Sequence, residues 1–492
     1  MTAPTDALRG LELLVLNWRD VRHPQAGGSE QYMHEIARRW VTAGAHVTWL
    51  TARVPGRPAH EVLDGIRVLR AGGPLSVYPR TAARLIGTRG YFDAVVDCQN
   101  GVPFFAPLFV GRDVPVVQVV HHVHQDQFAT RFSPPVAALG RLLEGPAARS
   151  VYADRAVAAV SPSTRTEIRR RIGLRGPVFV VPNGTAPPKP ADVRQRSARP
   201  TIVTVVRLVP HKRVDLLLGH LATAAEDIPD LQVGIVGDGP ERPRLRSLVS
   251  DLGLESVVRF HGRVSDEVRD HLLAGAWLTT STSAAEGWGC SVIEAAAAGV
   301  PCLALEAPGV RDSIVDGVTG WLVERPADLG TALVATMERL RDPELAAAVA
   351  GACRDWAAGF SWDRSADLLA GVVLEEMRAT QAQRRSREAN RRSARSDMAV
   401  AADMRSGDQG DLRDALRSTD EVAQLGDRTS VLLHGCDEFD VWGVLSRIGA
   451  EGAAVRPVDR RLLLTGPRRP YPPPRLPASG AVEGVGPIRD AV

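Results

Sequence analysis

The feature that most constrains this fold is a repeated alternation of short apolar runs with amphipathic segments. Residues 11–16 form an apolar run of strand length, residues 31–43 carry apolar side chains at a 3.6-residue period, and residues 46–50 read as a strand again. Gly44 ends the intervening helix. A strand–helix–strand unit of this kind predicts a parallel sheet with a right-handed crossover. Further strand-like runs follow at residues 94–96, 114–120, 156–160 and 178–181.

A second alternation begins after a segment rich in proline, alanine and charge at residues 186–200, which predicts an interdomain linker. Strands are expected at residues 201–206, 231–236, 257–260, 277–280 and 301–305. Helices are expected at residues 214–225, 241–252, 268–274, 290–298, 327–341 and 343–351. The sequence therefore predicts an α/β protein with two doubly wound domains, residues 8–185 and 201–360, whose ligand sites lie at the carboxyl ends of the strands.

The chain changes character after residue 377. Residues 378–428 begin with an arginine-studded stretch without an apolar stripe, which is typical of a solvated helix or flexible tether, or of a contact with anionic lipid. Residues 429–466 have the pattern of a small βαβ-like module. Residues 467–492 are rich in proline and glycine and are expected to be disordered.

Composition excludes several classes of function. The net charge of +3 over 492 residues gives no sign of a nucleic-acid partner, and no apolar run approaches the ~18 residues of a membrane span. No apolar segment marks a secretory signal at the amino terminus. The five cysteines form no CxxC pair, which favours a reducing cytoplasm over a disulfide framework or a structural zinc site.

The densest chemical signal lies between an expected strand and an expected helix, in the segment from Ser281 to Glu294. Gly287 and Gly289 allow a ligand to approach the backbone, and the helix that begins near Cys290 offers unpaired N–H groups to an anion. Glu286 and Glu294 could then accept hydrogen bonds from sugar and ribose hydroxyls. Alternatively, Glu294 merely complements the helix dipole and Glu286 is a loop charge.

Two cations follow the first strand of the second domain. Arg207 could bind a diphosphate as a planar fork and Lys212 as a compact point charge, or both could be solvated surface groups. Of the 60 lysines and arginines, only Lys189 and Lys212 are lysines, which singles out Lys212 because Lys189 lies in the linker. Arg213 is expected to face solvent. The turn Gly237, Asp238, Gly239 is compatible with backbone packing against a nucleotide.

In the first half, Gly27 and Gly28 precede a helix that Ser29 could cap. This loop is not GxGxxG, so it does not support NAD binding. Histidines then follow the run at 114–120, at positions 121, 122 and 124; they could be metal ligands, acid–base groups, ligands of a sugar hydroxyl, or structural residues. Asn183 and Gly184 form a turn at the border between the domains.

Taken in order, these motifs resemble the family-4 retaining glycosyltransferases of GT-B fold, over residues 11–377. The set comprises the Gly27–Gly28 loop, the histidine after a strand, Arg207 with Lys212, Gly237–Asp238–Gly239, and Glu286 with Glu294. The resemblance implies two Rossmann-like domains that face each other across a cleft. It also implies that the carboxyl-terminal domain holds a nucleotide-diphosphate sugar donor and that the amino-terminal domain holds the acceptor.

The resemblance also implies roles for single residues. Arg207 and Lys212 would bind the diphosphate, Glu294 the ribose and Glu286 the transferred sugar. His121, or its neighbour His122, would touch the hydroxyls of the sugar. The other residues expected near the donor are Gly27, Gly28, Asn183, Gly237, Asp238, Gly239, Gly287, Trp288, Gly289 and Cys290.

Two of these positions depart from the family pattern. Trp288 stands where phenylalanine is common, and Cys290 stands where a small or apolar residue is common. Cys290 is expected to be a packing residue. A helix within residues 361–377 should cross back onto the first domain.

The implied mechanism needs no cofactor beyond the donor itself. Positive charge at the diphosphate would make a metal dispensable, and the sequence has no DxD-type cluster to hold one. We expect a glycan or lipid-linked acceptor, a role in envelope or exopolysaccharide assembly, and a cytoplasmic protein with a peripheral contact at the inner membrane face. The alternatives are a nucleotide-sugar epimerase or phosphorylase of the same fold, or a non-catalytic sugar-nucleotide binding module. The sequence does not determine the donor sugar or the oligomeric state.

Overall fold

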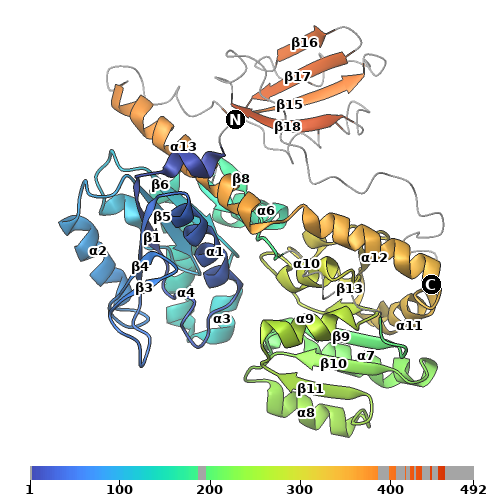
Figure 1. The fold of residues 1–492 in the computed structure, drawn as a ribbon. Coiled ribbons are helices and arrows are strands. Elements are labelled where there is room, and N and C mark those ends of the chain that lie inside the picture. The colour runs from blue at the N-terminus through green and yellow to red at the C-terminus, as the bar shows by residue number, and fades with distance from the viewer. Residues whose placement is uncertain are drawn as a thin grey trace. The chain divides into compact units, whose positions relative to one another are not determined.

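A computed structural model describes residues 3–174, 176–186, 196–385, 398–405, 416, 421–425, 428–434, 444–445 and 453–459. The chain divides into two compact units, one that holds residues 1–376 and a smaller one within residues 377–473. The first unit contains two α/β halves (Figure 1). The two units are described separately.

The amino-terminal half is built on an eight-stranded sheet with the order β3-β4-β2-β1-β5-β6-β7-β8. Its strands are β1 (Glu12–Leu16), β2 (His46–Thr51), β3 (His60–Leu63), β4 (Ile66–Arg70), β5 (Ala94–Gln99), β6 (Val116–Val120), β7 (Val157–Ala159) and β8 (Val178–Val180). All neighbours pair in parallel except β3 and β4, which form a hairpin. Its loop residues Asp64 and Gly65 both have positive φ, as a tight two-residue hairpin turn requires.

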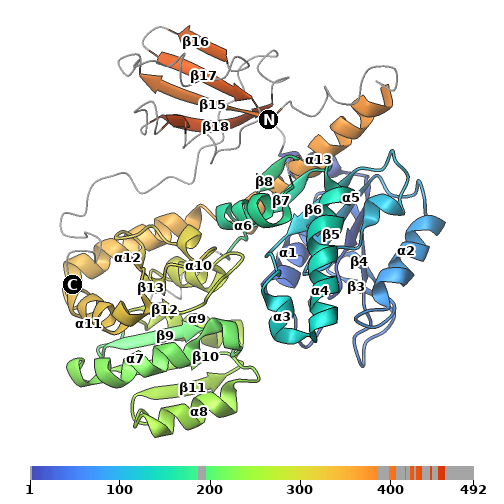
Figure 2. The ribbon, with the colours of Figure 1, turned by 180° about the vertical axis from the view of Figure 1, so that it is seen from behind.

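Helices cover this sheet and connect its strands (Figures 1 and 2). They are α1 (Gly28–Thr42), α2 (Val77–Gly87), α3 (Gln127–Arg131), α4 (Pro134–Leu142), α5 (Ala148–Tyr152) and α6 (Pro162–Glu167), with short 3₁₀ or π segments at Pro4–Leu8, Ala106–Leu108, Leu143–Ala147 and Ile168–Ile172. Strands β5, β6 and β7 are buried along their whole length, which explains their continuous apolar runs. The period of α1 places Ile36 and Trp40 in the core.

The carboxyl-terminal half has the strand order of a dinucleotide-binding fold. Its strands are β9 (Thr201–Val205), β10 (Gln232–Val236), β11 (Val258–Gly262), β12 (Thr279–Ser281), β13 (Cys302–Leu305) and β14 (Gly320–Val323). They form two parallel three-stranded sheets, β11-β10-β9 and β12-β13-β14, which a bridge between Ile202 and Leu278 joins. Chain order reverses between β9 and β12, and ligands of such sheets bind at that point.

The helices of this half are α7 (Val214–Asp227), α8 (Arg242–Asp251), α9 (Asp266–Ala274), α10 (Cys290–Ala297), α11 (Leu329–Arg339) and α12 (Pro343–Ala358), with 3₁₀ turns at Pro210–Lys212, Arg311–Ser313 and Pro326–Asp328. The α/β class with two doubly wound domains, predicted from the periodicity, is thereby confirmed.

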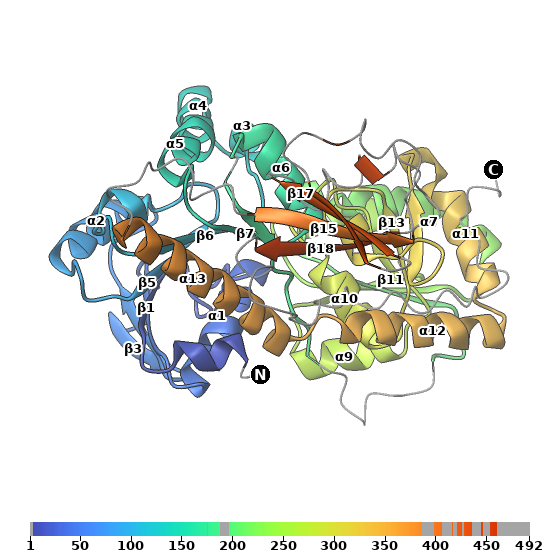
Figure 3. The same ribbon diagram turned by 90° about the horizontal axis from the view of Figure 1, so that it is seen from above.

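The helix α13 (Trp362–Arg385) packs on the amino-terminal half (Figure 3). The indole Nε1 of Trp40 donates to the carbonyl of Ala366 at 3.1 Å. The carboxylate of Glu376 accepts from the backbone N of Ala156 at 3.0 Å and pairs with Arg155 at 3.1 Å. The carboxyl-terminal end of the chain's α/β part is thus tied to the first sheet, and the helix runs eight residues beyond the expected end at 377.

The second unit differs from the sequence prediction. Its strands are β15 (Met398–Arg405), β16 (Glu421–Leu425), β17 (Arg428–His434) and β18 (Ala454–Asp459), in an antiparallel sheet of order β16-β17-β15-β18. The predicted βαβ-like module at 429–466 is therefore wrong in topology, and the predicted tether at 378–428 contains two strands. The central strand β15 was missed because Met398, Ala399, Ala401 and Ala402 give little β signal.

Two other expectations fall outside the described residues: most of the linker, at 187–195, and the disordered tail at 467–492. No helix that the structure describes is long and apolar enough to cross a lipid bilayer.

Candidate functional site

Lys212 lies at the carboxyl-terminal edge of the second sheet, in the loop after β9. A 3₁₀ turn, Pro210–Lys212, presents it, and Arg213 then adopts a left-handed conformation with φ of 50° before α7 begins. The ammonium of Lys212 forms an ion pair with Glu286, and both side chains are mostly buried, at 16% and 21% exposure. The structure thus brings together two predicted site residues that are 74 positions apart.

Glu286 is held in the loop after β12 by further contacts. Its Oε1 accepts a hydrogen bond from the hydroxyl of Ser283 at 2.7 Å, and its backbone N donates to the carbonyl of Pro308 at 2.9 Å. One carboxylate oxygen is therefore engaged by protein donors, which fixes the direction of the side chain at the strand edge.

Thr282 is a site residue that sequence reasoning missed. Its buried hydroxyl lies 3.0 Å from the carbonyl oxygen of Lys212 and 2.9 Å from that of Arg213, and it can donate to either. It therefore ties the loop after β12 to the turn that carries Lys212. Its only signal in the sequence was its position within the segment from Ser281 to Glu294.

The amino terminus of α10 faces the other half of the chain. A Cβ atom at Gly287 would collide with the carbonyl oxygen of His121, and one at Gly28 would lie 3.5 Å from Sγ of Cys290. Glycine at 287 is required because the histidine loop of the first half approaches the backbone there. The expected glycine loops of the two halves consequently meet beside the start of one helix.

Glu294 lies on α10, in the helix that follows the loop of Glu286. Burial raises the pKa of its carboxyl, and Arg269, at 3.9 Å, opposes that rise. Arg269 also pairs with Asp266 at 2.9 Å and with Asp270 at 2.7 Å, so this cation lies between aspartates of α9 and Glu294 of α10. No local pattern in the sequence connects Arg269 with Glu294.

Arg207 is exposed, and its guanidinium has no partner among the residues that the structure describes. The predicted turn Gly237–Asp238–Gly239 packs against the loop that carries Arg207. A Cβ atom at Gly237 would collide with the carbonyl of Val206, and one at Gly239 with that of Leu208. These two glycines are therefore explained by chain packing. Asp238 is bound by the backbone N of Gly239 at 2.8 Å and by Arg242 at 2.9 Å.

The Gly27–Gly28 loop is ordered by a buried carboxylate. Oε2 of Glu30 accepts from the backbone N of Gly27 at 2.7 Å, while Oε1 pairs with Arg19 at 3.0 Å. Gly27 is the N-cap of α1, so the expected cap at Ser29 is wrong: Glu30 reaches back across the first turn instead. Arg19 lies over the ring of Trp18 at 4.3 Å.

His121 and His122 follow β6 and have different surroundings. His121 is buried with its ring edge-on to Tyr32 at 4.9 Å, and its Nε2 has no hydrogen-bond partner. His122 packs against His124 at 5.2 Å and is within electrostatic range of His211 and Lys212. Burial, and then His124, lowers the pKa of both to about 3, so both imidazoles are neutral near pH 7 and can only exchange hydrogen bonds.

Glu144 is a second residue that the sequence did not reveal. It is fully buried in the π-helical turn Leu143–Ala147, and it accepts from the backbone N of His124 at 2.6 Å and from Gln125 at 2.8 Å. It thereby fixes the loop that carries His121 and His122.

Two further residues predicted to contact the sugar donor, Trp288 and Asn183, are buried, and Cys290 is partly buried. Trp288 packs on Phe360 with ring centroids 5.0 Å apart. Burial raises the pKa of the Cys290 thiol to about 12, in agreement with a packing role. Asn183 is buried and its Oδ1 has no partner, while a Cβ atom at Gly184 would collide with the backbone of Trp362.

The amino-terminal half adds uncharged polar groups at the carboxyl ends of β1 and β5. Nδ2 of Asn100 donates to Oδ1 of Asn17 at 2.9 Å, and Nδ2 of Asn17 is buried without a partner. Buried Asp97 shapes the loop after β5, because its carboxylate accepts from the backbone N of Phe104 at 3.0 Å and of Ala106 at 3.1 Å.

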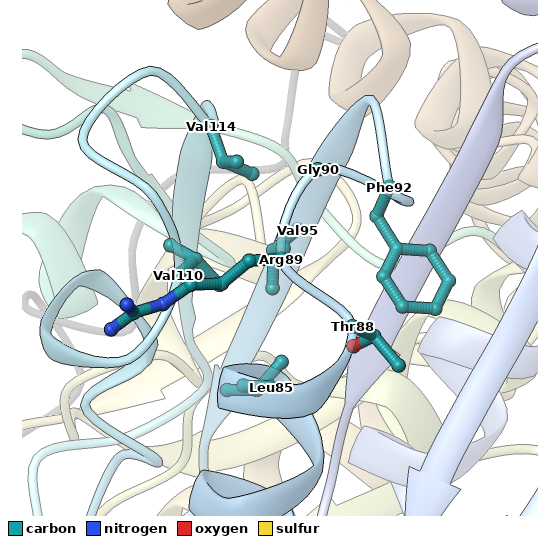
Figure 4. Close-up of a pocket in the computed structure, with 8 residues that line it drawn as sticks. All are labelled: Leu85, Thr88, Arg89, Gly90, Phe92, Val95, Val110 and Val114. Carbon is teal, nitrogen blue, oxygen red and sulfur yellow. The ribbon is translucent and has the colours of Figure 1, made fainter.

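Among the described residues, no group of three or more histidine, cysteine, aspartate or glutamate side chains is arranged to hold a metal ion. A small apolar cavity of about 10 Å³ lies near the opposite, amino-terminal ends of β5 and β6 (Figure 4). It is lined by Leu85, Thr88, Arg89, Gly90, Phe92, Val95, Val110 and Val114. It is too small for a sugar and distant from the charged edge.

Comparisons with known proteins bear on the family and the fold of this chain. Residues 26–189 match the model for glycosyltransferase family 4, and residues 187–355 match that for glycosyl transferases group 1. The GDP-mannose-dependent alpha-(1-6)-phosphatidylinositol monomannoside mannosyltransferase of Mycolicibacterium smegmatis is 33% identical, over 73% of this chain and 92% of its own length. The D-inositol 3-phosphate glycosyltransferase of Acidothermus cellulolyticus is 29% identical, over 73% and 88%. Sucrose-phosphate synthase from Thermosynechococcus elongatus has a similar structure, with a TM-score of 0.61 and 21% identity over 77% and 100% of the two chains.

Proposed function

The chain belongs to glycosyltransferase family 4, and from that premise we propose that it is a retaining, metal-independent transferase that moves a hexose-type sugar from a nucleotide-diphosphate sugar to a glycan or lipid-linked acceptor. Its activity as a glycosyltransferase and its GT-B fold follow from the family models and relatives. The stereochemistry, the metal independence, the acceptor class and a role in envelope biosynthesis are our inferences.

One observation carries the proposal: Lys212 and Glu286 form a mostly buried ion pair beside the amino terminus of α10. Lys212 supplies a point charge where a diphosphate would lie, and the N–H groups of α10 add partial positive charge. Glu286 supplies a carboxylate for sugar hydroxyls. A surface ion pair with no ligand role would not need the Thr282 and Ser283 contacts that hold it.

In the proposed step, the bond between C1 of the sugar and the phosphate oxygen breaks as C1 bonds to the acceptor oxygen on the same face. The acceptor proton passes to the departing phosphate oxygen. Arg207, Lys212 and the start of α10 stabilise the negative charge that develops on the diphosphate. The neutral His121 would accept from or donate to a sugar hydroxyl, which gives its unpartnered Nε2 a ligand.

The acceptor is proposed to lie at the ends of β1 and β5. Asn17 and Asn100 offer amide donors and acceptors without charge, which suits a hydroxyl nucleophile. Relatives named for phosphatidylinositol monomannoside and D-inositol 3-phosphate support a polyol acceptor, and the first supports GDP-mannose as the donor.

The test is release of nucleoside diphosphate from GDP-mannose, UDP-glucose and UDP-N-acetylglucosamine, with and without a phosphatidylinositol mannoside acceptor. We expect turnover of GDP-mannose that the acceptor stimulates, with an α-linked product. No release from any of the three donors would contradict the proposal.

The metal-free mechanism is tested with the same assay in excess EDTA. We expect an unchanged rate because fixed cations and helix dipoles replace the metal. A rate that is lost in EDTA and restored by Mg²⁺ or Mn²⁺ would refute this part of the proposal and leave the transfer itself intact.

A further inference from the structure

The helix α4 presents large apolar side chains to solvent and small ones to the protein. Only Ala137 and Gly140 of its nine residues are buried. A Cβ atom at Gly140 would collide with the ring of Phe128 on α3, so α4 lies very close to that ring. A helix normally faces its protein with its larger apolar residues, and α4 does the reverse.

The outward side of α4 is continuous and apolar. Leu139 and Leu142 are each 53% exposed, and Val136 is 49% exposed at one flank. Phe132, two residues before the helix begins, is 51% exposed. Pro135 and Ala138 complete the exposed side, and we call these six residues, Phe132, Val136, Leu139, Leu142, Pro135 and Ala138, the α4 face. Figure 2 shows α4 on the outside of the amino-terminal half.

The exposed charges on and next to α4 in the sequence are mostly positive. Residues 127–153 contain three arginines and a single acid, Glu144, which is fully buried in the turn after α4; the exposed Asp154 follows this segment. Arg141 and Arg149 are exposed. The exposed Asp126, just before this segment, is bound by Arg171 at 2.7 and 2.9 Å. The surface is therefore apolar with a cationic border.

We propose that the α4 face docks the protein on a membrane surface that contains anionic lipid. An apolar strip beside arginines fits the boundary between acyl chains and anionic headgroups, where leucine and phenylalanine enter the apolar layer and arginine meets phosphate. This goes beyond the proposed reaction, because it concerns where the protein resides.

The proposal differs from the contact with anionic lipid expected at the arginine-rich segment after residue 377. That segment supplies charge without an apolar stripe, and charge alone gives a contact that salt removes. The α4 face supplies both components, so it predicts binding that salt weakens but does not abolish.

The experiment is co-sedimentation of the full chain with vesicles, without donor or acceptor. One set is phosphatidylcholine alone and the other is phosphatidylcholine mixed with phosphatidylglycerol. We expect binding to the mixed vesicles, and a loss on the order of tenfold for each of Leu139→Glu and Leu142→Glu. The matched control is Val268→Glu, since Val268 is 45% exposed on α9 of the other half and should not matter.

The remaining outcomes are also decisive. If the glutamate variants fail to fold, the milder variants Leu139→Ser and Leu142→Ser take their place. Both should bind the mixed vesicles more weakly than the wild type and the Val268→Glu control. The proposal would be overturned if the leucine variants bound vesicles like the wild type. It would also be overturned if the double variant Arg384→Gln, Arg385→Gln lost binding while the leucine variants kept it. A dimer in solution that Leu139→Glu converts to a monomer would overturn it as well, since the α4 face would then cover a second copy. Because the assay uses no donor, its failure leaves the proposed transfer untouched.

Discussion

The two halves of this transferase share a fold but differ in the chemistry of their strand edges. The edge after β9 and β12 carries charge, with the Lys212–Glu286 pair and the exposed Arg207. The edge after β1, β5 and β6 carries neutral groups, with Asn17, Asn100 and histidines whose lowered pKa keeps them uncharged. The difference teaches that loops alone can give one doubly wound scaffold a charged edge or a neutral edge, which the proposed function assigns to the leaving group and to the nucleophile.

The largest expected effect is on the charged edge. Lys212→Ala and Glu286→Ala should each reduce transfer by about 10²–10³-fold, because each removes a group that stabilises or positions the reacting donor. Initial rates with saturating donor and acceptor measure this. The melting temperature should fall only modestly, since the pair keeps some exposure, 16% and 21%, at the strand edge; turnover at the wild-type rate would contradict the comparison.

A sharper test of the same edge is Lys212→Arg. The charge is kept but the compact ammonium becomes a planar fork, so we expect a loss of about 100-fold in kcat from misplacement. The matched control is Arg213→Lys at the neighbouring position, which should leave kcat within about twofold because that side chain has no assigned ligand. Equal activity of both variants would show that charge alone suffices.

Asn100→Ala tests the neutral edge. We expect the KM for the acceptor to rise about tenfold through loss of one hydrogen bond, with donor hydrolysis in the absence of acceptor unchanged. Steady-state kinetics with varied acceptor give the first value and nucleoside diphosphate release gives the second. A change confined to donor hydrolysis would place the donor, not the acceptor, at this edge.

Thr282→Val removes the hydroxyl that bonds the backbone of Lys212 and Arg213. We expect a loss of about 1 kcal/mol in stability and of about tenfold in kcat, with a smaller change in the KM for the donor. The control Thr223→Val removes a hydroxyl bond to the carbonyl of His220 on the exposed side of α7 and should affect neither. An unchanged kcat would reduce Thr282 to a structural residue.

The prediction with the least effect on activity near neutral pH concerns acid stability. The folded pKa of His121 is about 3 against about 6.5 in the unfolded chain, so only the unfolded chain takes up this proton between these values. The free energy of unfolding should therefore fall as the pH drops through that window, by at most about 1.4 kcal/mol per pH unit from this residue. His121→Gln should show a shallower fall in denaturant titrations; parallel curves would contradict the pKa.

Local sequence was sufficient to predict most strands of both α/β halves and the helices α7 to α12, because apolar period and glycine stops are local signals, but in the amino-terminal half it predicted only the helix α1. It was insufficient for the second unit, where the alanine-rich β15 is stabilised by pairing on both sides rather than by its own propensity. The hairpin of β3 and β4 also escaped prediction, because the Asp64–Gly65 turn does not stand between strongly apolar runs.

For the site, the sequence by itself determined which residue types were present and at which strand ends: the scarce lysine at 212, the carboxylates at 286 and 294, and the glycines before two helices. Only the tertiary structure decided that Lys212 meets Glu286, that Gly287 admits the carbonyl of His121, and that Thr282 and Glu144 hold the two loops. The physical reason is that these contacts join segments far apart in the chain, through turns such as the left-handed Arg213 that no local period encodes. The exposure of the α4 face was also decided by the tertiary structure. Its apolar residues are typical of a buried helix, and only the packing of α4 shows that they face outward.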